Sequence, residues 1–84
     1  MKILFCGNFK RESVGEPEIA YALEKEGHAV VRIPEDVTRG YIQEKIAGCD
    51  VFLYSKFRVK GAEEILREIK IPKICVLFDL YFGL

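Results

Sequence analysis

Short apolar runs alternate with helix-like segments along this chain of 84 residues, and no other feature constrains its fold as strongly. The runs are rich in β-branched and aromatic residues and are too continuous for one-sided burial, so they predict strands buried on both faces. Parallel strands need crossover connections, which are right-handed almost without exception. The runs are Lys2–Cys6, Ala29–Ile33, Asp50–Tyr54 and Lys73–Phe78.

The three segments between these runs carry helix signals. Residues 13–16 have the S-x-x-E form of a capping box, and Thr38 is the predicted start of the second helix. Gly27 is placed to end the first helix and Pro72 to stop the third. The apolar faces of the three helices are Ile19, Ala20, Ala22 and Leu23, then Ile42 and Ile46, then Ala62, Ile65, Leu66 and Ile69.

The resulting β-α-β-α-β-α-β order predicts one α/β domain over residues 1–84, with an open, Rossmann-like parallel sheet and helices on both faces. We expect the strand order 3-2-1-4. In that order the winding direction reverses between the first and fourth strands, and ligands of such sheets bind beyond the carboxyl ends of the strands at the reversal.

Loops after the first, third and fourth strands place candidate binding side chains at this edge. Asn8 offers a donor and an acceptor to a hydroxylated ligand, and Lys56 offers a point charge to a phosphate or carboxylate. Structural alternatives stay open: Asn8 as a turn former, Lys56 as a solvated lysine and Asp79 as a cap. The predicted binding residues are Gly7, Asn8, Phe9, Lys56, Asp79 and Tyr81, with no catalytic residue, metal ligand or cofactor site among them.

The cysteines and the histidine have weaker functional signals. Cys6 follows the first strand, as in some phosphate-binding loops, but only four residues separate it from Arg11, one fewer than the low-molecular-weight phosphatase loop has. We therefore expect Cys6 to be a buried, inert thiol and Cys75 to lie in the core. His28 falls at the opposite edge of the sheet, so a structural role is expected, and the glutamates of the first helix, Glu16 included, read as a solvated face.

Composition excludes several partners. The net charge is zero, so no broad positive field is present to hold nucleic acid. No apolar run approaches the ~20 residues of a membrane span or the form of a signal peptide. Three widely spaced cysteines suit reduced thiols, and together these observations predict a cytoplasmic protein.

Four stretches of the chain resemble the amino-terminal domain of GT-B glycosyltransferases, particularly the CgeB-like and related retaining enzymes. Residues 1–9 and 19–30 look like the family's opening strand, loop and "ALxxxGHxV" passage. Residues 49–56 and 71–81 are similar to its "DLvlvyK … gIPvvxxxxD" arrangement. Phe78 stands where the family often has a histidine.

The resemblance implies sugar transfer from a nucleotide-sugar donor, in a cleft between two Rossmann-like domains of which the first mainly binds the acceptor. It implies that the Gly7-Asn8 loop approaches the donor phosphates or the reacting sugar, that Lys56 lines the cleft and that Asp79 is an acceptor-side polar residue. The chain is then the truncated first half of a longer enzyme and inactive alone.

A second interpretation belongs to a different class. The chain is then a stand-alone Rossmann-like or receiver-like interaction module without catalysis, and the exposed edge of its fourth strand pairs with a partner or a second copy. A third, minor interpretation is a phosphocarrier that uses Cys6. Acceptor and nucleotide sugar are partners only in the first of these interpretations.

Overall fold

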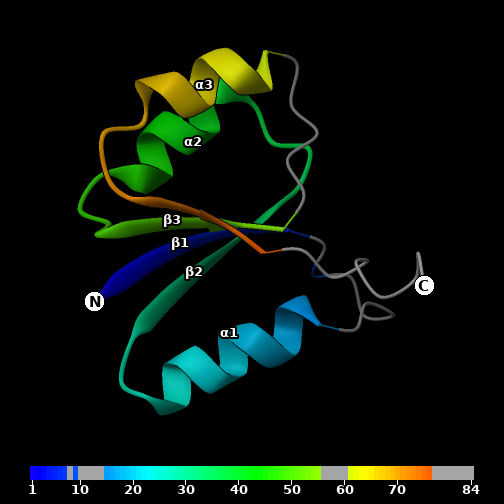
Figure 1. Ribbon diagram of the computed structural model, residues 1–84, viewed down its shortest axis with the longest axis vertical. Coiled ribbons are helices and arrows are strands. Elements are labelled where there is room, and N and C mark those ends of the chain that lie inside the picture. The colour runs from blue at the N-terminus through cyan, green and yellow to red at the C-terminus, as the bar shows by residue number, and fades with distance from the viewer. Residues whose placement is uncertain (8, 10–14, 56–60, 77–84) are drawn as a thin grey trace.

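The computed structural model of the chain describes residues 1–7, 9, 15–55 and 61–76. These residues form a parallel four-stranded sheet with helices on both faces, as the alternating runs predict (Figure 1). None of the helices in this part of the chain has the length and hydropathy needed to cross a bilayer. The strands are β1 (Lys2–Gly7), β2 (Ala29–Pro34), β3 (Val51–Tyr54) and β4 (Lys73–Cys75), and the helices are α1 (Glu16–Lys25), α2 (Arg39–Ile46) and α3 (Ala62–Glu68).

The strand order is β2-β1-β3-β4, so the expected order 3-2-1-4 is wrong. In register, β1 pairs with β2 through Lys2↔Ala29 and with β3 through Ile3↔Val51. The winding direction therefore reverses between β1 and β3, and not between β1 and β4. The point at which such sheets bind ligands moves accordingly to the carboxyl ends of β1 and β3.

Burial explains why β3 and not β2 is an inner strand. Phe52 and Leu53 of β3 are both buried, one on each face, which requires packed layers on both sides. In β2 only Ile33 is buried, and the strand carries the charged Arg32 and ends at Pro34, which has no N–H for a further ladder bond. A charge and a proline suit an edge strand, so β2 lies outside β1.

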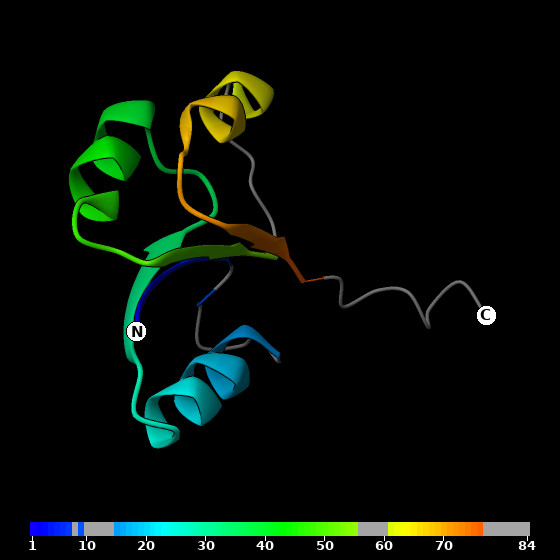
Figure 2. The same ribbon diagram turned by 60° about the vertical axis from the view of Figure 1, so that its left-hand side comes forward.

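Helices α2 and α3 lie on one face of the sheet and α1 lies on the other (Figure 2). The side chains of β1 alternate between two apolar layers: Leu4 and Cys6 belong to the layer with α2 and α3, and Ile3 and Phe5 to the layer with α1. Five of the six residues of β1 are buried, which makes it the central strand of the core. The layer on the α2 and α3 side is the larger, with Ile33, Ile42, Cys49, Phe52, Ile65 and Ile69, and the α1 layer adds Ala20 and Leu53.

Helix α1 begins later than the capping-box pattern predicts. Gly15 is its N-cap, with φ of 107° and no side-chain cap, so Glu16 is the first helical residue and cannot serve as the fourth member of a box. The predicted cap residue Ser13 lies outside the described residues. The end of the helix is as expected: Gly27 has φ of 97°, and the amide of His28 donates to the Leu23 carbonyl at 3.1 Å, which is a Schellman arrangement.

Helix α2 begins where Thr38 predicts it. The Thr38 hydroxyl accepts a hydrogen bond from the Tyr41 amide at 3.2 Å. Thr38→Ala should lower the free energy of unfolding by about 1 kcal/mol, because it removes the partner of an otherwise unbonded helix amide. Thr38→Ser, which keeps the hydroxyl, is the matched control, and urea unfolding measures both; equal losses in the two variants would contradict a capping role.

Strand β4 departs from the predicted buried strand. Its three residues are all exposed, Ile74 to 51%, and it occupies one edge of the sheet beyond β3. Cys75 is exposed, so its expected place in the core is wrong. A strand at the edge of a sheet pairs with a neighbouring strand on one flank only, and the side chains of β4 lie outside the core. Residues 77–78 of the predicted strand lie outside the described residues.

Candidate functional site

Gly7, Glu16 and Ser55 come together at the carboxyl ends of β1 and β3. The ladder between the strands continues through the Ser55 amide, which donates to the Cys6 carbonyl at 3.1 Å. The Ser55 hydroxyl donates to Oε2 of Glu16 at 2.8 Å, so the first residue of α1 is tied to the end of β3. Glu16 is only 4% exposed and is the one buried charged residue in the described part of the chain. The expectation that Glu16 belongs to a solvated helix face is therefore wrong.

Gly7 has no side chain, which leaves space for the hydrogen bond between Ser55 and Glu16. A Cβ at Gly7 would lie 2.5 Å from Oγ of Ser55, closer than real Cβ atoms approach another atom, and 3.0 Å from Cγ of Glu16, closer than nine in ten of them do. Gly7 is the last residue of β1, and its φ is not among the positive values of the described glycines. Its role is thus neither a turn nor an unusual backbone angle, but the absence of a side chain.

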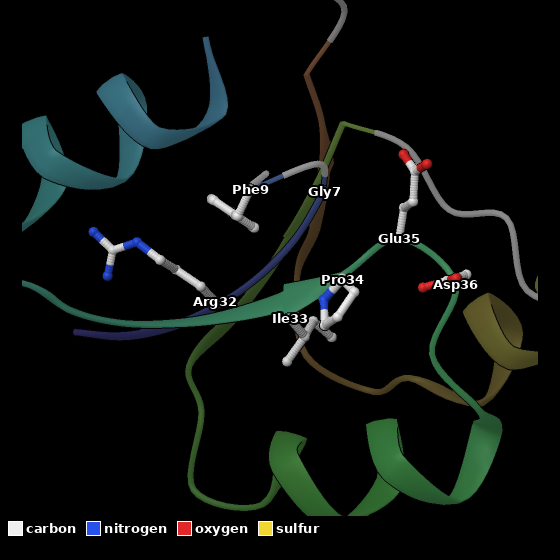
Figure 3. A pocket seen from close by; sticks show the side chains of 7 residues that line it. All are labelled: Gly7, Phe9, Arg32, Ile33, Pro34, Glu35 and Asp36. Atoms are coloured by element: carbon white, nitrogen blue, oxygen red, sulfur yellow. The ribbon is translucent and has the colours of Figure 1, made fainter. Parts of the chain in front are cut away.

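A pocket of about 400 Å³ opens beside Gly7, beyond the carboxyl ends of β1 and β2 (Figure 3). Its walls combine an apolar part with charged groups. Figure 3 shows the carboxylates of Glu35 and Asp36 on one side of Pro34 and the guanidinium of Arg32 on the other. The lining residues are Gly7, Phe9, Arg32, Ile33, Pro34, Glu35 and Asp36.

Phe9 forms the aromatic wall of the pocket. Its ring meets Phe5 edge to face, with ring centroids 5.0 Å apart and planes at 87°. Phe5 is fully buried, so this contact anchors Phe9 to the core layer on the α1 side. Phe9 itself remains partly exposed and presents apolar surface to a ligand.

Among the described residues that line the pocket, two are carboxylates and one is a cation. Arg32 is paired with Glu24 on α1 through two hydrogen bonds, of 2.7 and 3.0 Å. This pairing with Arg32 holds the pKa of Glu24 below its usual value and raises the pKa of Arg32. The two carboxylates of the lining are Glu35 and Asp36, and they help to raise the pKa of the Cys6 thiol.

The Cys6 thiol is buried and hydrogen-bonded. It is fully buried beneath the pocket, and its Sγ donates to the Pro34 carbonyl at 3.3 Å. Burial, with the charges of Glu35 and Asp36, raises the pKa of the Cys6 thiol from 9.0 to about 12. The expected burial of Cys6 is confirmed, and the raised pKa disfavours the thiolate, which is the nucleophilic form.

His28 lies at the opposite end of the sheet from the pocket, as expected. It precedes β2, and its Nδ1 lies 3.2 Å from the amino group of Met1 at the start of β1. Among the described residues, no group of three or more histidines, cysteines or carboxylates is arranged to hold a metal ion.

Of the predicted binding residues, Gly7 and Phe9 line the pocket. The pocket also contains Glu35 and Asp36, which the sequence analysis did not single out. Their signal is their position directly after β2, at the carboxyl edge of the sheet, which is the edge where such sheets bind ligands. The remaining predicted residues, Asn8, Lys56, Asp79 and Tyr81, lie outside the described residues.

Comparisons with protein-family models, with curated proteins and with solved structures returned no match for this chain. Its functional interpretation therefore depends on the pocket and its surroundings.

Proposed function

We propose that this domain binds a sugar or another hydroxylated acceptor in the pocket beside Gly7, as the acceptor-side domain of a GT-B glycosyltransferase that uses a nucleotide-sugar donor. The observation that carries the proposal is the combination of an aromatic wall with carboxylates in one pocket. Sugar rings have apolar C–H faces that pack on a ring such as Phe9, and hydroxyls that donate to carboxylates such as Glu35 and Asp36. Few polar groups in a largely apolar cleft are typical of small-molecule sites.

The charge of the pocket supports the acceptor over the donor as its ligand. A nucleotide sugar carries a diphosphate, and carboxylates near a phosphate oppose its binding. Among the described residues that line the pocket, the one cation, Arg32, is paired with Glu24. The sequence resemblance described above is the support for sugar transfer itself.

Titration calorimetry with a panel of free hexoses and their methyl glycosides tests the proposal. Phe9→Ala and Asp36→Asn should each weaken binding of the best sugar about fivefold, or by ~1 kcal/mol. The first removes the ring contact, and the second replaces a charge-assisted hydrogen bond with a weaker neutral one. Tyr21→Ala, an exposed aromatic of α1 outside the pocket, and Glu18→Gln, an exposed carboxylate, are the matched controls and should bind as the unaltered chain does. Absence of binding for the whole panel, or equal binding by all four variants, would reject the proposal.

The strand order favours the second candidate, a receiver-like interaction module. The order β2-β1-β3-β4 is that of flavodoxin-like and receiver-like sheets, whereas dinucleotide-binding Rossmann sheets have the order 3-2-1-4 at their centre. The exposed β4, with Ile74 at 51%, supplies an edge for strand pairing. The strand order adds no support to the glycosyltransferase proposal.

Sedimentation velocity over a concentration series separates the two candidates. A module that pairs through β4 should form a dimer at low micromolar concentration, and Ile74→Lys should return it to the monomer, because a lysine at this edge opposes pairing. A chain that stays monomeric throughout contradicts self-pairing and leaves the acceptor-binding domain as the candidate.

A further inference from the structure

The carboxylate of Glu16 lies at a position of unusual importance in a doubly wound sheet. It is the first residue of α1, directly after the loop that follows β1. In proteins of this architecture that bind phosphorylated ligands, the phosphate lies at this helix start, where free amides and the helix dipole favour an anion. Here the chain supplies an anion of its own.

One hydrogen bond and close packing hold that anion in place. The Ser55 hydroxyl donates to Oε2 of Glu16 at 2.8 Å, and the side chain is 4% exposed. Gly7 has no side chain, so the carboxylate packs closely against its backbone; a Cβ there would lie 3.4 Å from the same oxygen. Pro17, the second residue of α1, has no amide proton, so one of the donors that a phosphate would use is missing as well.

Gly7 also connects Glu16 with the proposed ligand pocket, since it lines the pocket on one side and touches Glu16 on the other. Glu16 thus lies at the same edge of the sheet as Glu35 and Asp36. A buried charge is screened less by solvent and salt than an exposed one.

We propose that Glu16 determines the charge selectivity of this edge: it occupies the start of α1 with an internal carboxylate, so the site accepts neutral or cationic ligands and rejects phosphorylated ones. The inference deepens the proposed function, on which it rests, because it restricts the acceptor to sugars or polyols without a phosphate group.

Inorganic phosphate is the probe for the test, measured by the shift of amide resonances in two-dimensional NMR and by thermal stabilisation. The unaltered chain should show no phosphate-dependent shift at the amides of Glu16 and Glu18. Glu16→Gln keeps the shape of the side chain and one oxygen that can accept from Ser55 but removes the charge, and it should raise phosphate affinity about fivefold or more. Glu18→Gln removes the same charge from an exposed position in the same helical turn and should leave phosphate affinity unchanged.

The outcomes are distinct. Equal phosphate affinity in Glu16→Gln and the unaltered chain, or an equal increase in both glutamine variants, would overturn the role of Glu16. If Glu16→Gln does not fold, the unaltered chain still decides: phosphate-dependent shifts at the amides of Glu16 and Glu18 contradict the proposal, and their absence up to high phosphate concentration supports it. Sugar binding that depends on Phe9 and Asp36 is measured separately, so failure here does not remove the proposed function.

Discussion

Gly7→Ala should lower the free energy of unfolding by about 2–3 kcal/mol, although alanine suits an extended backbone better than glycine does. The new methyl group would lie 2.5 Å from Oγ of Ser55 and 3.0 Å from Cγ of Glu16. The hydroxyl can rotate away only by giving up its hydrogen bond to a carboxylate that is 4% exposed. Loss of a hydrogen bond to a buried charged group costs roughly 1.5–3 kcal/mol.

A double-mutant cycle with Ser55→Ala identifies the cause. Each single change loses the same hydrogen bond, and Ser55→Ala also removes the atom that the new methyl group would strike. The double variant should therefore be more stable than the sum of the two single effects requires, by about 1 kcal/mol or more. Urea unfolding of the four proteins gives the coupling, and simple additivity would show that Gly7 acts independently of Ser55.

Alkaline pH should destabilise the chain through Cys6. The pKa of this thiol is about 12 in the folded protein, against 9.0 without the fold, so folding keeps the proton on the sulfur. Above pH 9 the unfolded chain loses this proton and the folded chain does not. Stability from this group is therefore complete below pH 9 and is lost as pH rises toward 12, by about 1.4 kcal/mol per pH unit.

Cys6→Ala isolates this contribution. The variant loses some packing at every pH, but between pH 8 and about pH 10.5 its unfolding free energy should fall by about 2 kcal/mol less than that of the unaltered chain. Burial also raises the pKa values of Cys49 and Tyr54, and these groups titrate in both proteins, so they cancel in the comparison. Parallel pH profiles of the two proteins would show that Cys6 is not held protonated by the fold.

The strands, the helices and the parallel sheet were predictable because each depends on a local pattern. Continuous apolar runs, Thr38 as a cap and Gly27 as a terminator all act within a few residues, and the structure confirms each of them. The strand order was not predictable from local patterns, because it depends on which strand buries more apolar side chains on both faces of the sheet. Arg32 and Pro34 in the second run were the signal that it forms an edge.

The candidate site was predicted in part for the same reason. Gly7 and Phe9 follow the first strand in any order of the sheet, so their place at the carboxyl edge was secure. Glu35 and Asp36 follow the second strand, which lies beside the first strand but away from the reversal in both the expected and the observed order, so a search at the reversal missed them. The capping-box pattern at 13–16 failed because a serine 39 residues away in sequence, Ser55, holds Glu16 instead, and no local pattern reveals such a partner.

The central position of β1 has a consequence for how the chain assembles. Strand β1 has a neighbour on each flank, and one of them, β3, enters its register only at Val51. Until that residue has been synthesised, one flank of β1 has no backbone partner, and Leu4 and Phe5 lack their neighbours Phe52 and Leu53. Synthesis must therefore continue through β3 before β1 is paired on both flanks.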